Sequence, residues 1–110
     1  MKIMIATPEA IPYAKTGGLA DVAGSLIKEY RGMKKEAHII MPLYKKIKEK
    51  GVPLKDTGLK INVPLGNRKI QGRIFSDKSS AYFMGCDEFF DRDELYGTPQ
   101  GDYSDNVSRF

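Results

Sequence analysis

The stretch Lys15-Thr16-Gly17-Gly18-Leu19 decides the fold, because it joins a short apolar run at residues 3–6 to an amphipathic segment that begins at Leu19. A strand, a glycine-containing loop and a helix in this order direct backbone N–H groups and the positive end of a helix dipole towards one point. Two adjacent glycines let the main chain approach an anion, and Lys15 adds a mobile charge. The pattern is neither the dinucleotide-binding fingerprint nor the Walker loop. Two interpretations therefore stand: an anion site, or a tight turn that needs glycine.

The residues on both sides predict one strand-helix-strand unit. Residues 2–6 are typical of a buried parallel strand, and residues 37–41, which end at Pro42, predict a second one. The helix between them should end near Gly32, and its apolar positions follow helical spacing: Leu19, Val22, Ala23, Leu26, Ile27 and Tyr30. The carboxyl ends of both strands then share one edge with the Lys15 loop, and open α/β sheets bind ligands at this edge.

The middle of the chain changes from helical to alternating patterns. Residues 43–50 predict a short basic helix. Residues 59–65 and 68–75 alternate around Gly66-Asn67 and predict an antiparallel hairpin, in which Pro64 indicates an edge strand. The sequence therefore predicts a Rossmann-like parallel sheet with an antiparallel hairpin insertion.

Towards the end of the chain the periodicity disappears. Residues 80–85 predict one more strand, and residues 87–104, rich in aromatic residues, aspartate and glycine, predict a long ordered loop with a functional role. Residues 104–106 indicate a helix start that leaves barely one turn before Phe110.

Composition excludes several classes of protein. The chain of 110 residues has 41% hydrophobic and 29% charged residues, as expected for one small globular domain. Its net charge of +4 is modest, and the basic clusters at residues 31–35 and 45–50 are interpreted as solvated helix faces, not a nucleic-acid groove. No run is long enough to span a membrane or to act as a signal peptide, so we expect a cytoplasmic protein. Cys86 is expected to be a core residue at a strand end, and the lone His38 gives no support to a metal site.

Several separated stretches resemble the bacterial glycogen synthases and plant starch synthases, glycosyltransferase family 5. The first runs from Pro8-Glu9 through Lys15-Thr16-Gly17-Gly18-Leu19-Ala20-Asp21-Val22, and the second is Ile40-Met41-Pro42-Leu43-Tyr44. The others are Phe89-Phe90-Asp91-Arg92, Leu95-Tyr96-Gly97, Asp102-Tyr103-Ser104-Asp105-Asn106 and Arg109-Phe110. They occur in the family's order over the whole chain. Lys34-Lys35 departs from the family, which usually has Gly-His before its second strand, and this leaves open where the first helix ends.

The resemblance implies a GT-B fold with two Rossmann-like halves around a cleft, and a defined reaction. Glucose is transferred from ADP-glucose or UDP-glucose to the non-reducing end of an α-1,4-glucan, with retention and without a metal ion or other cofactor. Residues 1–110 would form only the N-terminal part of that catalytic domain, so we expect little or no activity from this chain alone. The alternatives are a non-catalytic binding module for glucan or nucleotide sugar, and one part of a split enzyme completed by a separately encoded remainder.

The resemblance also assigns roles to residues. Lys15, Gly17 and Gly18 would contact the sugar nucleotide and its phosphates, and Asp21 would face the sugar as the catalytic acidic residue. Glu9 and Tyr96 would lie at the acceptor side of the cleft. Each has a plainer interpretation: Asp21 as a first-turn acid favoured by the helix dipole, Glu9 as a solvated loop carboxylate, and Tyr96 as an aromatic loop anchor.

Overall fold

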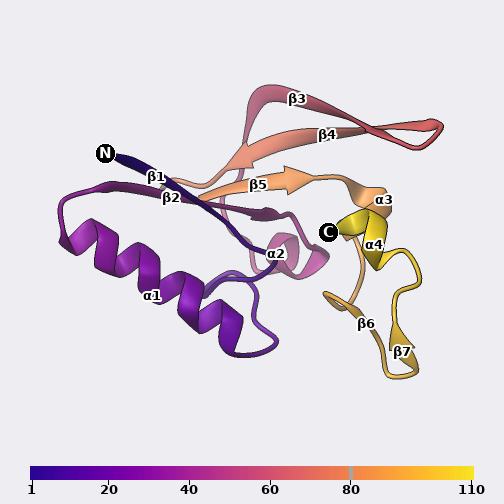
Figure 1. Cartoon of the computed structure of the whole chain (residues 1–110), viewed down its shortest axis with the longest axis horizontal. Helices are drawn as coiled ribbons and strands as arrows, with labels where there is room; N and C mark the ends of the chain where they lie inside the picture. Colours follow the sequence, from indigo (N-terminus) through magenta and orange to yellow (C-terminus); the bar gives the residue numbers. More distant parts are fainter. Residues whose placement is uncertain (80) are drawn as a thin grey trace.

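The computed structural model describes residues 1–79 and 81–110 and contains a five-stranded sheet in the order β1-β2-β5-β4-β3 (Figure 1). Three strands, β1 (Lys2–Ala6), β2 (Glu36–Pro42) and β5 (Ala81–Gly85), run parallel to one another. Two more, β4 (Arg68–Ser76) and β3 (Lys55–Leu65), extend the sheet in antiparallel fashion from β5. The predicted Rossmann-like parallel sheet with an antiparallel hairpin is confirmed. Residue 80, which the sequence placed in the fifth strand, lies outside the described residues.

The helix α1 (Gly18–Gly32) packs on one face of the parallel strands, below them in Figure 1. From β2 the side chains of Ala37, Ile39 and Met41 are buried on this face, in one cluster with Ala23 and Ile27 of α1. The strand–helix–strand unit predicted around Lys15 is therefore present, and it places the loop between β1 and α1 at the carboxyl ends of the strands.

The face of α1 that packs on the sheet differs from the prediction. Leu19, Val22 and Leu26, expected in the core, are exposed, while Ala20 and Ala23 are buried together with Ile27. Ala23 belongs to the core cluster with the strands, and its small side chain lets α1 lie close to them, whereas Ala20 is hydrogen-bonded to Glu9 and Ile11 of the β1–α1 loop. The apolar spacing thus predicts the helix correctly, but the larger apolar side chains, Leu19, Val22 and Leu26, lie outside its buried face.

The β3–β4 hairpin follows the predicted turn at Gly66, whose φ of 60° is in the left-handed region. Pro64 lies on β3, the outermost strand, which confirms the predicted edge position. β3 starts at Lys55, four residues before the predicted start at residue 59. Between Asp56 and Lys60 its pairing with β4 is irregular, and Gly58 there has a φ of 80°. An irregularity of this kind breaks the alternation on which the prediction depended.

The short helix α2 (Lys45–Glu49) is confirmed, but its lysines are not simply solvated. Lysines of α2 form four ion pairs with the later segment: Lys45 with Asp93, Lys46 with Glu94, and Lys48 with both Asp87 and Asp91, with N–O distances of 2.8, 2.9, 2.8 and 3.3 Å. Each exposed pair is worth at most about 1 kcal/mol. Together they fix the direction in which residues 87–94 leave the sheet.

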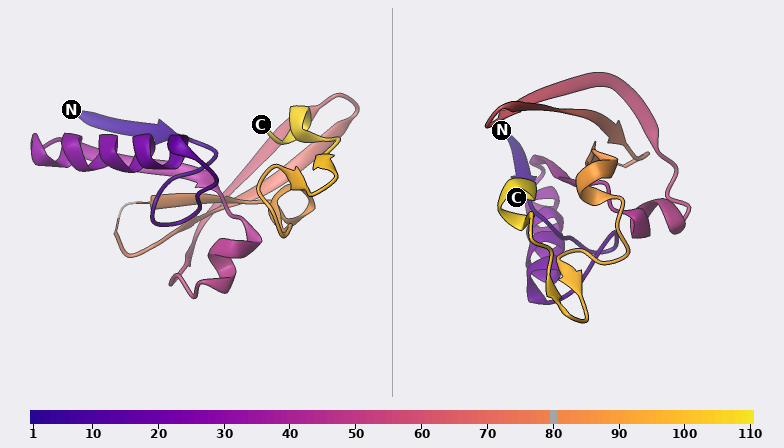
Figure 2. Two further views of the ribbon diagram at one scale, coloured as in Figure 1. Left: turned by 90° about the horizontal axis from the view of Figure 1, so that it is seen from below. Right: turned by 90° about the vertical axis from the view of Figure 1, so that its right-hand side faces the viewer.

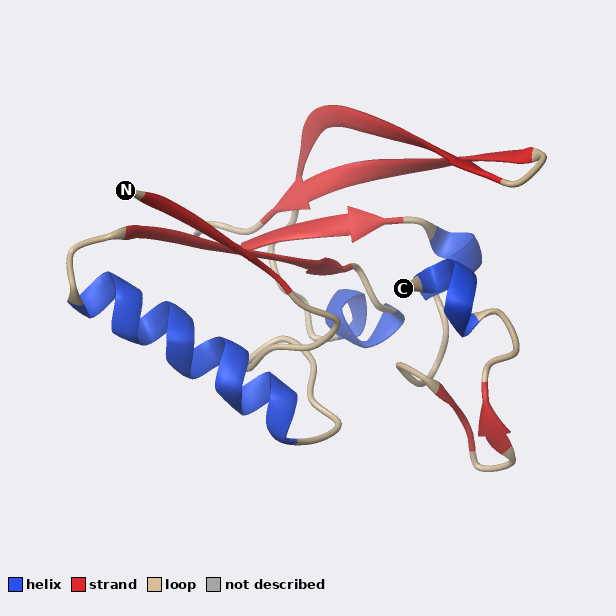
Figure 3. Ribbon diagram, viewed as in Figure 1, coloured by secondary structure: helices blue, strands red, loops and turns tan. Residues whose placement is uncertain are grey.

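The segment predicted as a loop contains very short elements, drawn at the right of Figure 3: α3 (Asp87–Phe90), β6 (Gly97–Thr98) and β7 (Gly101–Asp102). The helix start predicted at residues 104–106 is followed by α4 (Asn106–Arg109), one turn long. Elements of two to four residues are too short to show a period in the sequence. A bidentate ion pair connects the end of α3 to the start of α4: Arg92 Nη1 and Nη2 donate to the carboxylate of Asp105 at 2.7 and 2.6 Å. Figure 2 shows this segment gathered at the end of the sheet to which β1 and β5 point. None of the helices in the described part of the chain is long and apolar enough to cross a membrane.

Candidate functional site

The loop between β1 and α1 is held in place before it reaches Lys15. Ala10 and Ala14 are buried and exchange two backbone hydrogen bonds of 3.0 Å, which close a small ring of chain. Lys50, after α2, donates to the carbonyls of Pro12 and Tyr13 at 3.1 and 2.7 Å. The residues that follow therefore start from a fixed point at the carboxyl edge of the sheet.

Glu9 is the centre of this site. Its side chain is buried, with the residue only 2% exposed, and its carboxylate accepts four hydrogen bonds. Oε1 accepts from the amides of Gly17 and Ala20 at 3.1 and 3.2 Å. Oε2 accepts from the hydroxyls of Thr16 and Tyr96 at 2.5 and 2.6 Å. A carboxylate from the preceding loop thus caps α1 and ties in a residue from the far end of the chain.

These contacts shift the ionisation of both acidic groups. Burial acts to raise the pKa of Glu9, but the hydrogen bonds from Thr16, Tyr96 and the two amides outweigh it and hold that pKa below its usual value. Burial, with the adjoining Glu9 carboxylate, raises the pKa of Tyr96. At neutral pH Glu9 is therefore an anion and Tyr96 a neutral donor, the states that the hydrogen bond between them requires.

Lys15 and Asp21 form a second, more exposed pair beside the first. Lys15 Nζ donates to both carboxylate oxygens of Asp21, at 3.0 and 2.7 Å, and about half of each side chain is accessible to solvent. Asp21 lies in the first turn of α1. The lysine thus lies at the helix N-terminus and its ammonium group is available to an incoming anion that competes with Asp21.

The two glycines are not explained by backbone geometry. Gly17 has a φ of −162°, an extended conformation open to any residue, and Gly18 is also outside the left-handed region. A Cβ atom added at either position would meet no heavy atom within 4 Å. A tight turn that requires glycine is therefore the weaker interpretation, and the backbone at both glycines is open to the approach of another molecule.

A hollow of about 340 Å³ lies next to this loop, between Thr16 and the β6–β7 region. Its lining includes Tyr96 and Asp102. The carbonyl of Tyr96 accepts from the backbone N–H of Tyr103 and from the side-chain amide of Asn106, both at 2.9 Å. Tyr96 is thus held from both ends, and it forms a wall shared by the hollow and the Glu9 network.

A sequence model described as the starch synthase catalytic domain matches residues 2–110. The chain belongs to this family. Among curated relatives, the glycogen synthase of Syntrophotalea carbinolica is 42% identical over 113 residues and that of Aquifex aeolicus 36% over 110; each match covers 100% of this chain and 23% of the relative. The fold is similar to a solved catalytic domain of starch synthase IV from Arabidopsis thaliana bound to ADP and acarbose, with a TM-score of 0.71 and 20% identity over 90% of this chain and 22% of that one. The chain thus spans about a quarter of the starch synthase family members it matches, and its fold is a partial domain.

Within this member of the starch synthase family, the structure brings the residues predicted from the sequence into two adjoining groups. Glu9 and Tyr96 share a hydrogen bond, although 87 residues separate them, and Lys15 pairs with Asp21. Glu9 is buried, so its plainer interpretation as a solvated loop carboxylate is wrong. Thr16, which the sequence analysis did not single out, completes the network through its hydroxyl group.

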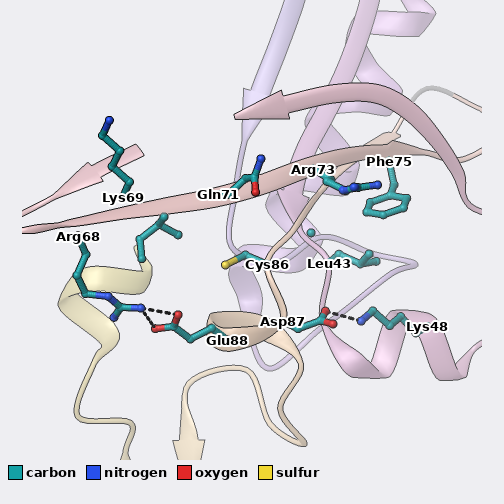
Figure 4. Close-up of a pocket in the computed structure, with 12 residues that line it drawn as sticks. Leu43, Lys48, Arg68, Lys69, Gln71, Arg73, Phe75, Cys86, Asp87 and Glu88 are labelled. Carbon is teal, nitrogen blue, oxygen red and sulfur yellow. Dashed lines mark hydrogen bonds and ion pairs between the residues drawn. The ribbon is translucent and has the colours of Figure 1, made fainter. Parts of the chain in front are cut away.

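A larger hollow, of about 430 Å³, lies elsewhere on the molecule, between β4, α2 and α3 (Figure 4). Figure 4 shows two ion pairs across it, Arg68 with Glu88 and Lys48 with Asp87. No residue of the Lys15 loop lines it. Cys86, directly after β5, is half-buried at its floor, at the strand end where the sequence placed it.

Proposed function

We propose that this chain forms the nucleotide-sugar wall of a glycogen or starch synthase, which transfers glucose from ADP-glucose or UDP-glucose to the non-reducing end of an α-1,4-glucan with retention. The observation that carries the proposal is the family match over residues 2–110, combined with a lysine and two uncrowded glycines at a helix N-terminus. The cytoplasmic location expected from the sequence stays a prediction.

The diphosphate of the donor would lie against Gly18 and Leu19. Glu9 occupies the amides of Gly17 and Ala20, whereas within residues 1–79 and 81–110 the amides of Gly18 and Leu19 have no hydrogen-bond acceptor. The departing nucleoside diphosphate gains negative charge in the transition state, so fixed amides and the Lys15 ammonium group stabilise that state more than the ground state.

Asp21 would have two roles. In the free chain it holds Lys15 at the helix N-terminus through contacts of 2.7 and 3.0 Å. Once a phosphate takes over Lys15, the Asp21 carboxylate is released towards the sugar, where the family resemblance places its catalytic role. Tyr96 would meet the glucan acceptor through the ring surface that lines the adjoining hollow, since its hydroxyl group is committed to Glu9.

This chain by itself would bind but not turn over the donor, because it spans 23% of the length of relatives such as the Syntrophotalea carbinolica glycogen synthase. It would act as one part of an enzyme whose remaining part supplies the other wall of the cleft. A non-catalytic binding module for nucleotide sugar or glucan is the second candidate, and it is favoured by the hollow of about 340 Å³ beside the Lys15 loop.

The proposal is tested by titrating ADP into the purified ¹⁵N-labelled chain. We expect the amide signals of Gly18 and Leu19 to move with a dissociation constant of about 1 mM, equivalent to about 4 kcal/mol, while the signal of Gly17 moves less because Glu9 holds it. Lys15→Gln should weaken binding about tenfold. Lys28→Gln, on the exposed part of the same helix, is the matched control and should leave binding unchanged. Static Gly18 and Leu19 signals at 10 mM ADP would refute the phosphate site.

A further inference from the structure

Tyr13 joins the loop that carries Lys15 to a distant part of the sheet. Its hydroxyl group donates to the carboxylate of Asp77 at 2.5 Å, although 64 positions separate the two residues in the sequence. Its ring packs edge-on against Phe83, the middle residue of β5, with the ring centroids 5.1 Å apart. Asp77 lies between β4 and β5, at the amino end of β5, whereas Lys15 lies at the carboxyl edge of the parallel strands. The phenol side chain therefore connects the Lys15 loop to the remote end of β5.

Asp77 is itself held firmly. Its carboxylate also accepts from the backbone N–H groups of Ser79 and Ala81, at 3.0 and 3.1 Å, and from the hydroxyl group of Ser79 at 3.0 Å. Burial acts to raise the pKa of Asp77, but the hydrogen bonds outweigh it and hold that pKa below its usual value. Burial, with the hydrogen bond to Asp77, raises the pKa of Tyr13. At neutral pH a fixed anion thus accepts from a neutral phenol, and hydrogen bonds to charged groups are the stronger kind.

The main chain of Tyr13 is anchored as well. Its N–H group donates to the carbonyl of Ala10 at 2.9 Å, and its carbonyl accepts from Lys50 Nζ at 2.7 Å. Lys15 follows two positions later, and its side chain forms an ion pair with Asp21 in which both side chains are about half exposed. A pair of this kind is worth at most about 1 kcal/mol, so it holds a long side chain only weakly. The place of the Lys15 ammonium group therefore depends on how firmly the preceding residues are held.

We propose that Tyr13 and Asp77 are positioning residues for Lys15, because their hydrogen bond fixes the loop so that the ammonium group lies at the N-terminus of α1. Neither residue lines the hollow beside the loop, so both act through the lysine. Glu9 and Tyr96 form a second tyrosine–carboxylate pair on the same loop, which is thus held from two directions. This inference deepens the proposed function and rests on it for the ligand that Lys15 receives.

The first test measures backbone order in the ligand-free ¹⁵N-labelled chain. Tyr13→Phe removes one hydroxyl group and keeps the ring, so the chain should stay folded. We expect the order parameter of the Lys15 amide to fall from about 0.85 to about 0.7 or lower. Asp77→Asn should have the same effect, and the double variant should be no more mobile than either single variant. Thr57→Val is the matched control, since it removes a hydroxyl group that donates to the carbonyl of Ile74 at 2.7 Å on the β3–β4 hairpin.

The second test measures ADP binding through the amide signals of Gly18 and Leu19. Tyr13→Phe should weaken binding about threefold, because a smaller fraction of the molecules presents the lysine in the competent position. In a Lys15→Gln background the same substitution should have no effect, since no ammonium group is left to position. Thr57→Val should lower the free energy of unfolding and leave the affinity for ADP unchanged.

The two tests separate this proposal from the nucleotide site. The proposal is overturned if the Lys15 amide is equally ordered in Tyr13→Phe and Thr57→Val, or if Tyr13→Phe weakens ADP binding equally with and without Lys15. Failure of the wild type to bind ADP would instead remove the nucleotide site. The ligand-free measurement would still decide whether Tyr13 and Asp77 position the lysine.

Discussion

Replacing Glu9 with glutamine should lower the free energy of unfolding of the chain, by an amount that can be worked out from the four hydrogen bonds that the carboxylate accepts. In the wild type, one charged group accepts from two amides and two hydroxyls at 2.5–3.2 Å. The amide of glutamine can still accept through its oxygen from Gly17 and Ala20, and its NH₂ group can donate to Thr16 and Tyr96 if both hydroxyls rotate. The network is then satisfied but uncharged.

The magnitude follows from the lost charge. A hydrogen bond to a charged group contributes about 1 kcal/mol more than a neutral one, and here at least two amide donors are affected. A negative charge at the N-terminus of α1 adds about 0.3–1 kcal/mol. The free energy of unfolding should therefore fall by about 2–3 kcal/mol. With a urea slope of about 1–2 kcal/mol/M for a domain of this size, the unfolding midpoint should move down by roughly 1–3 M.

The pH dependence gives an independent check of the sign. The pKa of Glu9 is held below its usual 4.5 in the folded chain, so its contribution to stability is fully present above pH 4.5 and is lost as pH falls through the lower folded value. Wild type and Glu9→Gln should thus differ most above pH 4.5 and converge as the pH falls through the lowered pKa of Glu9. Glu29→Gln, on the exposed part of the same helix, is the control and should change the midpoint little. A wild-type midpoint for Glu9→Gln at pH 7 would refute the capping role.

Two further predictions concern the partners of these groups. Tyr96→Phe removes one donor from Glu9 and should lower the free energy of unfolding by about 1–2 kcal/mol. In a double-mutant cycle measured by urea unfolding, the double variant with Glu9→Gln should lose less stability than the sum of the two single losses. Asp21→Asn frees Lys15 from an exposed ion pair worth at most about 1 kcal/mol. ADP should therefore bind up to about fivefold more tightly in calorimetry. Weaker binding would show instead that Asp21 positions Lys15 for the phosphate.

The sequence correctly predicts those elements whose apolar pattern repeats over enough residues to be recognised. The strands at residues 2–6 and 36–42 and the helix between them have such patterns, and the turn at Gly66 needs a left-handed φ that glycine supplies. The sequence did not predict which face of α1 is buried. Two overlapping apolar faces are possible along this helix, and packing against the rest of the chain determines which of them is buried. The very short elements α3, β6 and β7 show no pattern, whereas the start of α4 was predicted at residues 104–106.

The candidate site residues were predicted through the family resemblance, but their contacts with one another were not. Glu9 contacts residues 7, 8, 11 and 87 positions away, and no local pattern indicates that one carboxylate joins all of them. The burial of Arg109 was not predicted either. An arginine at the end of a short helix is expected to be solvated, and its burial becomes visible only when the rings of Phe90, Tyr103 and Phe110 are placed around it.

The capping of α1 by Glu9 constrains how the proposed anion site would work. A free helix N-terminus offers several amides and a positive dipole, but here a buried anion already occupies two of those amides and offsets much of that potential. In the proposed function, the attraction for a phosphate would then come mainly from Lys15, with Gly18 and Leu19 supplying direction. Because Asp21 neutralises Lys15 in the free chain, a phosphate would have to displace the Asp21 carboxylate. A ligand with at least two negative charges would do so more readily, and a diphosphate is such a ligand.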